Sequence, residues 1–262
     1  MRYLKILKVS LTFFPLYIYG QGWEEVRSVD LAQNPSSYTV DYQGNFFLGF
    51  EDGKLLKYSP EGEVLENFSL SNYSSITSID VQNNLKPFLF YFDNQRITIL
   101  DRFSSVPKNY LLSDLGLEIG MATCPAPDGD FWIIENNPQR LKKIDPLLQT
   151  TVLEVQIQVG DSIKRMQAYQ NILIIGNEKG IKVLDQFGGV IQDLEIEGFI
   201  DFQIQKGSLY SITKEEIIEI DPYKGIVKKT LVNPSKTNAI LRSKDLFLSL
   251  ENERITYYRL IE

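Results

Sequence analysis

The sequence predicts an all-β fold, a six-bladed β-propeller whose blades are four-stranded antiparallel sheets. A short strand-like stretch recurs at intervals of about 36–44 residues, as KLLKYSP, RITILDR, RLKKIDP, GIKVLDQ, EIIEIDP and RITYYRL. A more apolar run, such as FLFYFD or ILIIGNE, precedes each copy and is typical of a strand covered on both faces. Gly, Asn, Asp and Pro separate these runs and favour tight turns. Short strands repeated with this period indicate a propeller.

The first residues have the pattern of a targeting signal. Arg2, Lys5 and Lys8 form a basic start, and residues 9–20 are an apolar stretch that ends in a small residue. This stretch is shorter than the roughly 20 apolar residues that a transmembrane helix requires. We therefore expect residues 1–20 to be a signal peptide cleaved near Gly20, followed by a single propeller domain over residues 22–262. The alternatives are an uncleaved anchor or a buried strand.

Each repeat unit is expected to hold two further strands, one before the apolar run and one after the recurring stretch. Examples of the first kind are SIDVQ and KRMQA, and examples of the second are EVLENF and VIQDLE. The resulting blades are expected near residues 37–71, 76–114, 119–157, 163–197, 199–233 and 236–262. The sixth has only three strands of its own, which would leave an exposed sheet edge. WEEVRSVDL, residues 23–31, is expected to pair outside RITYYRL and close the ring.

Composition limits the chemistry. The formal net charge is −7, and removal of residues 1–20 would make it −10, so a basic surface for nucleic acid is not expected. The chain has no histidine, which excludes the Ser/His/Asp triad and His-ligated zinc or haem. Cys124 is the single cysteine, so no internal disulfide can form, and we interpret it as a buried structural thiol.

The location of the protein can also be predicted. An exported chain without disulfides is typical of the bacterial envelope, so we expect the mature protein to be periplasmic, outer-membrane-associated or secreted. No cofactor and no transmembrane segment are expected in the mature chain.

One polar set can be placed from strand alternation. The first strand of each blade lines the central channel, and its residues alternate between two faces. Alternation therefore places a set of polar side chains on the channel. The set includes Thr39 and the candidate ligand-binding residues Asp41, Asp80, Arg165, Gln167, Asp201 and Gln203. Two interpretations remain open: a ligand or metal pocket at the channel mouth, and a solvated wall in which Arg165 balances the aspartates.

The repeats resemble a broad family of bacterial secreted propellers with NHL-like or quinoprotein-like repeats. The similarity is carried by units such as GKLLKYSPEGEVLENF (53–68) and GIKVLDQFGGVIQDLEI (180–196), and it extends over the whole mature chain. The resemblance implies a six-bladed propeller, and it implies a binding or scaffolding surface more often than an enzyme. In broad terms the sequence is also similar to the propeller component of the bacterial outer-membrane barrel-assembly machinery.

Two functions follow from these observations. The first is a non-catalytic module that binds an envelope protein partner, with four aromatic residues of expected loops as candidate anchors: Tyr73, Phe103, Tyr110 and Tyr223. The second is a metal-dependent hydrolase or lactonase, with Asp41, Asp80 and Asp201 as a carboxylate site. The absence of recognisable catalytic motifs favours the first, and fold similarity by itself decides neither.

Overall fold

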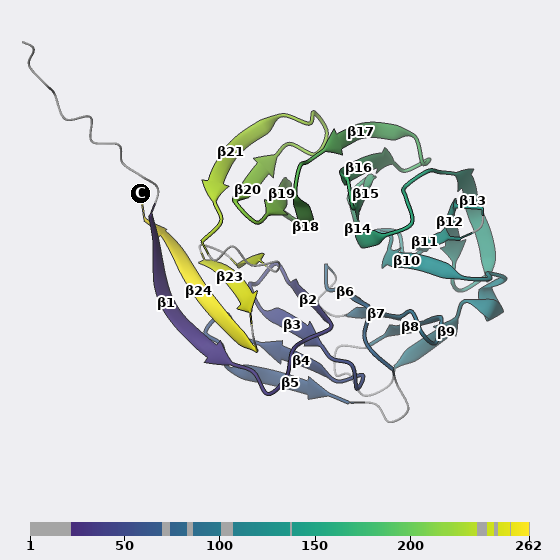
Figure 1. Cartoon of the computed structure of the whole chain (residues 1–262). Coiled ribbons are helices and arrows are strands. Elements are labelled where there is room, and N and C mark those ends of the chain that lie inside the picture. The colour runs from purple at the N-terminus through teal and green to yellow at the C-terminus, as the bar shows by residue number, and fades with distance from the viewer. Residues whose placement is uncertain are drawn as a thin grey trace, which may run out of the picture.

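The computed structural model describes residues 22–69, 74–82, 86–100, 107–136, 138–234, 240–243, 246–251 and 253–261. Within these ranges the chain forms the strands β1 to β24 and one short 3-10 helix, η1 (Ser113–Leu115). The strands make six four-stranded antiparallel sheets arranged in a ring, which confirms the expected six-bladed propeller (Figure 1). The expected signal peptide lies outside the described residues.

The first three blades follow one another along the chain. Blade 1 consists of β2 (Ser37–Val40), β3 (Phe46–Gly49), β4 (Leu55–Tyr58) and β5 (Val64–Phe68). Blade 2 consists of β6 (Ser78–Asp80), β7 (Phe88–Tyr91), β8 (Arg96–Ile99) and β9 (Lys108–Leu111). Blade 3 consists of β10 (Gly120–Pro125), β11 (Phe131–Glu135), β12 (Arg140–Asp145) and β13 (Thr150–Gln156).

The remaining blades complete the ring. Blade 4 consists of β14 (Ile163–Tyr169), β15 (Ile172–Asn177), β16 (Gly180–Asp185) and β17 (Val190–Glu195). Blade 5 consists of β18 (Phe199–Gln205), β19 (Ser208–Thr213), β20 (Glu216–Ile220) and β21 (Val227–Val232). Blade 6 consists of β22 (Ile240–Ser243), β23 (Leu246–Glu251), β24 (Arg254–Ile261) and β1 (Gly22–Asp30).

The position of a strand within its blade explains its composition. The second strands of blades 1, 2 and 3, namely β3, β7 and β11, are buried at every residue because neighbouring blades cover both faces. The fourth strands, such as β5 and β21, lie at the rim and are mostly exposed. The most apolar run of each repeat therefore occupies the interior of the ring wall, as the sequence predicts.

The ring is closed by the N-terminal strand. β1 pairs with β24 in antiparallel register from Gly22 opposite Ile261 to Asp30 opposite Arg254, and the two strands lie side by side in Figure 1. Trp23 strengthens the closure, because its Nε1 donates a hydrogen bond to the carbonyl of Val232 in blade 5 at 2.8 Å. The expected joining of the two ends of the chain in one blade is confirmed.

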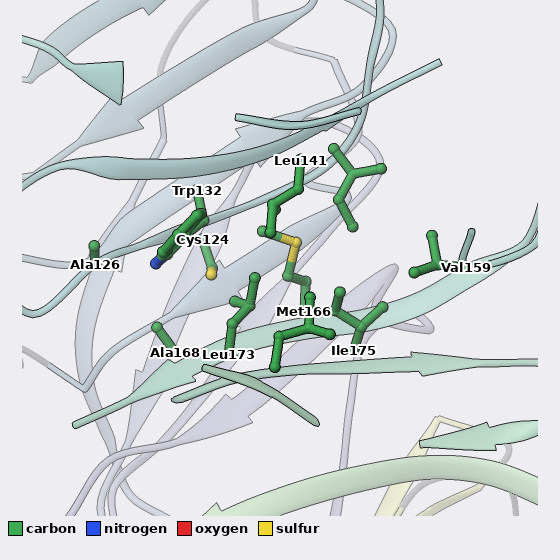
Figure 2. Close-up of a cluster of buried hydrophobic side chains, with 11 residues drawn as sticks. Cys124, Ala126, Trp132, Leu141, Val159, Met166, Ala168, Leu173 and Ile175 are labelled. Atoms are coloured by element: carbon green, nitrogen blue, oxygen red, sulfur yellow. The ribbon is translucent and has the colours of Figure 1, made fainter. Parts of the chain in front are cut away.

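The core is divided among the interfaces between blades. Figure 2 shows the cluster between blades 3 and 4, where side chains of β10, β11 and β12 meet those of β14 and β15. Cys124 is fully buried there with Trp132 and Leu173 in the same cluster. Burial, together with the charge of Asp80, raises the pKa of the Cys124 thiol well above its ordinary value. Cys124 is thus the buried thiol that the sequence indicates.

Candidate functional site

The central channel holds a small polar cavity. The first strands β2, β6, β10, β14 and β18 surround the centre of the ring in Figure 1, and residues of all five blades line this cavity of about 200 Å³. Its charged and hydrogen-bonding side chains include Tyr38, Asp80, Thr123, Arg165 and Asp201. Three of the candidate ligand-binding residues, Asp80, Arg165 and Asp201, are therefore brought together on one cavity.

Arg165 and Asp201 form a buried ion pair in this cavity. The guanidinium of Arg165 donates from Nε to Oδ1 of Asp201 and from Nη2 to Oδ2, each at 2.8 Å. Tyr38 of blade 1 completes the set, because its hydroxyl donates to Oδ2 of Asp201 at 3.2 Å and its carbonyl accepts from Arg165 Nη2 at 3.3 Å. The set therefore joins blades 1, 4 and 5 across the channel.

The electrostatics follow from this geometry. Burial alone would lower the pKa of Arg165, but the ion pair with Asp201 holds it above its ordinary value. Burial and the charge of Asp201 raise the pKa of the Tyr38 hydroxyl well above its usual range. Arg165 thus stays charged and Tyr38 stays protonated at physiological pH. The carboxylate of Asp201 accepts both groups, so it is already engaged by the chain's own donors.

Asp80 is the titratable group of the cavity. It ends β6, and its Oδ1 accepts a hydrogen bond from the backbone N–H of Gln82 at 2.9 Å. Burial raises the pKa of Asp80 to about 6, although the Gln82 hydrogen bond and the charge of Arg165 act in the opposite direction. The carboxyl therefore changes charge close to physiological pH.

The structure places the other candidate ligand-binding residues elsewhere. β2 ends at Val40, and Asp41 is the first residue of the hairpin turn that follows. Its Oδ1 accepts from the backbone N–H groups of Gln43 and Asn45, and its Oδ2 accepts from Asn45 Nδ2 at 2.8 Å. Asp41 thus stabilises its own turn, because a short polar side chain at this position replaces a backbone acceptor.

The two glutamines are on the first strands but do not line the cavity. Gln203 on β18 accepts from the backbone N–H of Arg242 at 2.7 Å and donates to its carbonyl at 3.1 Å, so it connects blade 5 to β22. Gln167 is half-buried on β14, on the same face as Arg165. Thr39, which we also expected on the channel, is buried in β2.

These placements bear on the carboxylate site that a metal-dependent hydrolase would need. In the described ranges, no group of three or more Cys, Asp or Glu side chains is placed to hold a metal ion. The physical reason is that Asp41 is held by its hairpin and Asp201 by Arg165 and Tyr38. What the cavity offers is the Arg165–Asp201 ion pair, the charge of Lys164 and one titratable carboxyl, an arrangement suited to a small polar molecule or to water.

A second feature lies on the outer turns of blades 3, 4 and 5. In each of these blades the turn from the third to the fourth strand begins with an aspartate whose Oδ1 accepts the backbone N–H two residues later, at 2.8–3.0 Å. The residue that donates is an exposed apolar or aromatic one in each case: Leu147 (82% exposed), Phe187 (68%) and Tyr223 (36%). This bond fixes the backbone of the turn at that residue.

Blade 1 builds the same turn with a different tip. Ser59 takes the place of the aspartate and its Oγ accepts from the backbone N–H of Glu61 at 3.1 Å, so the tip residue is acidic. Among the turns that the structure describes, the apolar tips lie on the consecutive blades 3, 4 and 5, and the corresponding turn of blade 2 lies outside the described residues. We call Leu147, Phe187 and Tyr223 the apolar turn tips. Sequence reasoning identified Tyr223 but missed Leu147 and Phe187, although the shared Asp-x-apolar pattern in DPL, DQF and DPY could have indicated them.

The remaining predicted aromatic anchors have other surroundings. Tyr73 and Phe103 lie outside the described residues. Tyr110 is half-buried on β9 and packs edge-on against Phe131 with 5.2 Å between the ring centres. Tyr223 has its hydroxyl 3.1 Å from Oδ1 of Asn171 and 3.0 Å from Oε1 of Gln170, so its ring is anchored against blade 4.

Over the described ranges, no helix is long and apolar enough to span a membrane.

Comparisons with known proteins identify the fold. No family model matches the sequence, and no curated protein matches it. The propeller domain of Cps50 (Swd1) from Myceliophteria thermophila is 11% identical with a TM-score of 0.65, and covers 92% of this chain and 100% of its own. Virginiamycin B lyase from Staphylococcus aureus is 13% identical with a TM-score of 0.61, at the same coverage. BamB from Moraxella catarrhalis is 12% identical with a TM-score of 0.50, covering 91% of this chain and 98% of its own. At such identities the similarity shows the propeller fold alone.

Proposed function

We propose that this protein is a non-catalytic interaction module of the bacterial envelope that binds a protein partner through the apolar turn tips of blades 3, 4 and 5. The observation that carries the proposal is the display of Leu147, Phe187 and Tyr223 on three consecutive blades, each on a turn whose first aspartate accepts a hydrogen bond from the backbone N–H of the exposed residue. Exposed aliphatic and aromatic side chains on a rigid scaffold are suited to serve as anchors at protein interfaces.

The turns support this role because they are held in place before any partner binds. Each aspartate fixes the backbone of its turn, and the Tyr223 carbonyl also accepts a hydrogen bond from Gln192 of blade 4 at 2.9 Å. An anchor on an ordered turn loses little conformational entropy on binding, which favours affinity. The blade 1 turn, with Glu61 at its tip, would not provide such an anchor. The envelope location rests on the expected signal peptide of residues 1–20.

The enzyme alternative receives less support from the channel. A carboxylate metal site would need Asp41, Asp80 and Asp201 to converge, and only Asp80 and Asp201 share the cavity. Arg165 lies against Asp201 with a doubly hydrogen-bonded ion pair, which fills the position that a cation would need. We therefore propose the interaction module as the function and assign the cavity no reaction.

Site-specific photocrosslinking in the native envelope tests the proposal. A benzophenone amino acid is introduced at position 147 or 187, and at position 61 as the matched control on the equivalent turn. Because exposed anchors contact the partner directly, we expect a discrete crosslinked species from positions 147 and 187 and none from position 61. The combined substitution Leu147→Ser with Phe187→Ser should weaken binding of the purified partner about tenfold, since anchor residues dominate interface energetics.

Both wild type and variant should unfold at the same temperature, because these side chains are mostly exposed. Crosslinking that is the same at all three positions, or absent at both 147 and 187, would contradict the proposal.

A further inference from the structure

A groove of about 1070 Å³ runs between blades 4 and 5. Its lining comes from β17 and the segment that leads from it into β18, from the turn between β19 and β20, and from β20 with the start of β21. The apolar part of this lining consists mainly of Leu194, Ile196, Ile218, Ile220 and Val227. Leu194, Ile196 and Ile218 are only partly buried, so the groove exposes apolar surface that the core does not cover.

The rim of the groove is acidic. Five carboxylates line it, from Asp193, Glu195 and Glu197 on one side and Glu215 and Glu216 on the other, and Asp193 is already paired with Lys182 of β16. Among the described residues that line the groove, Lys214 is the only base. All five acidic side chains are exposed, so a bound cation would meet them at the surface without a large desolvation cost. The local field therefore favours a positively charged partner and disfavours an anionic one.

The backbone adds a third element of recognition. β17 is the last strand in the order of blade 4, so within the described structure it has a sheet partner on one side only. An edge strand presents N–H and C=O groups that an extended peptide can pair with, as proteins that bind peptides by strand addition show. Residues 193–195 of this edge strand line the groove together with its apolar floor and acidic rim.

We infer that this groove binds an extended peptide segment of the protein partner in which basic and apolar side chains alternate. The apolar side chains would lie on Leu194, Ile218 and Val227, and the basic ones would face Glu195, Glu215 and Glu216. The inference rests on the proposed function, because it names the part of the partner that this ring receives. The groove is continuous with the blade 5 turn, since Gly225 and Val227 belong to its lining and follow Tyr223.

Peptide binding to the purified full chain tests the groove by itself. The probe is a short fluorescein-labelled peptide of alternating lysine and leucine, followed by fluorescence anisotropy. Two control peptides have glutamate in place of lysine, or serine in place of leucine. We expect the lysine–leucine peptide to bind at least about tenfold more tightly than either control, and its binding to weaken at about 0.5 M salt because exposed charges are screened.

Two matched pairs of variants locate the binding. The double substitution Glu215→Lys with Glu216→Lys should weaken peptide binding about tenfold, whereas Glu61→Lys with Glu63→Lys on blade 1 makes the same change of net charge and should leave binding within about twofold. Val227→Ser should weaken binding about fivefold, whereas Ile226→Ser should have little effect. Val227 and Ile226 are adjacent and similarly exposed (55% and 57%), but only Val227 lines the groove.

Equal loss of binding in the blade 1 and groove variants, or tight binding of the glutamate–leucine peptide, would overturn the inference. If photocrosslinking at positions 147 and 187 succeeds while the lysine–leucine peptide fails to bind, the groove inference alone is wrong. If crosslinking fails while the peptide binds at the groove, the groove is the interaction surface and the apolar turn tips do not contact the partner.

Discussion

At the scale of single residues, the channel is organised by one buried cation. Arg165 connects three blades because its guanidinium has enough donors to satisfy both oxygens of Asp201 and a carbonyl of Tyr38 together. The Arg165–Asp201 pair is neutral as a whole, and Lys164 adds a positive charge to the cavity lining. The net charge of the cavity changes when Asp80 titrates. The stability of the channel wall depends on the Arg165–Asp201 ion pair.

Removal of the acidic partner tests the contribution of the ion pair to stability. We expect Asp201→Asn to lower the free energy of unfolding by about 3 kcal/mol, because Arg165 would keep a buried charge without its counter-ion. Urea unfolding measures the effect. Asp193→Asn is the matched control, since Asp193 also pairs with a base, Lys182, but its side chain is exposed. That control should change stability by less than about 1 kcal/mol, and equal effects of the two substitutions would contradict a special role for the buried pair.

The raised pKa of Asp80 makes a prediction about pH. A carboxyl with a pKa near 3.8 when unfolded and about 6 when folded binds its proton more tightly in the folded protein. Its stabilising contribution is thus complete below about pH 4 and is lost as the pH rises through 6. We expect Asp80→Asn to match the wild type near pH 4 and to exceed its free energy of unfolding by up to about 3 kcal/mol near pH 8.

The comparison uses the difference between the two proteins at each pH, so titration of all other groups cancels. Asparagine can still accept the hydrogen bond from Gln82, which keeps the geometry of the β6 end. A difference that stays constant from pH 4 to pH 8 would show that Asp80 titrates normally in the folded protein.

At the scale of elements, a feature can be predicted from the sequence when the residues that determine it are close together in the chain. Alternation assigns the first strand of each blade a channel face, and three residues that it places there, Asp80, Arg165 and Asp201, line one cavity. Alternation does not say where a strand ends, so Asp41 was expected on the channel wall although β2 ends one residue earlier. Gln203 faces the channel side of β18 but bonds to the backbone of β22, a contact between blades that a local pattern cannot encode.

Turns were the least predictable elements for a related reason. Leu147 and Phe187 follow the polar signature of a tight turn, and a turn signature normally indicates solvent-exposed residues without a role. Their significance comes from the comparison of equivalent turns in the ring, which requires the register of every blade. The groove between blades 4 and 5 combines β17 with β20, segments of different repeat units, and therefore has no contiguous sequence signal.

At the scale of the whole molecule, the repeat determines both the number of blades and the closure. The sixth unit lacks a fourth strand, and the ring needs one to cover β24, so the pairing of β1 with β24 could be predicted before any contact was known. The details of that closure, such as the edge-on packing of Trp23 on Phe247 at 5.0 Å, could not, because they depend on the packing of blade 5 against blade 6.

Deletion of residues 22–30 tests whether the ring is stable without this strand. We expect the free energy of unfolding to fall by at least about 4 kcal/mol, or about 10 °C in Tm, because the deletion exposes β24 and removes Trp23 from its contacts. Thermal unfolding followed by circular dichroism measures the effect. Glu24→Gln, which removes only an exposed ion pair with Arg259 at 3.7 Å, should leave the Tm nearly unchanged. An unchanged Tm in the deletion would contradict closure by β1.

The register of the closing strands also determines how the ring responds to force. Gly22 lies opposite Ile261 at the same end of the β1–β24 ladder, so tension between these two residues pulls the strands apart from that end. Antiparallel hydrogen bonds lie across the strands, and this loading direction ruptures them one after another, like a zipper, instead of shearing all of them at once. The seam is therefore mechanically soft along this direction, even though thermal unfolding must disrupt the whole ring together.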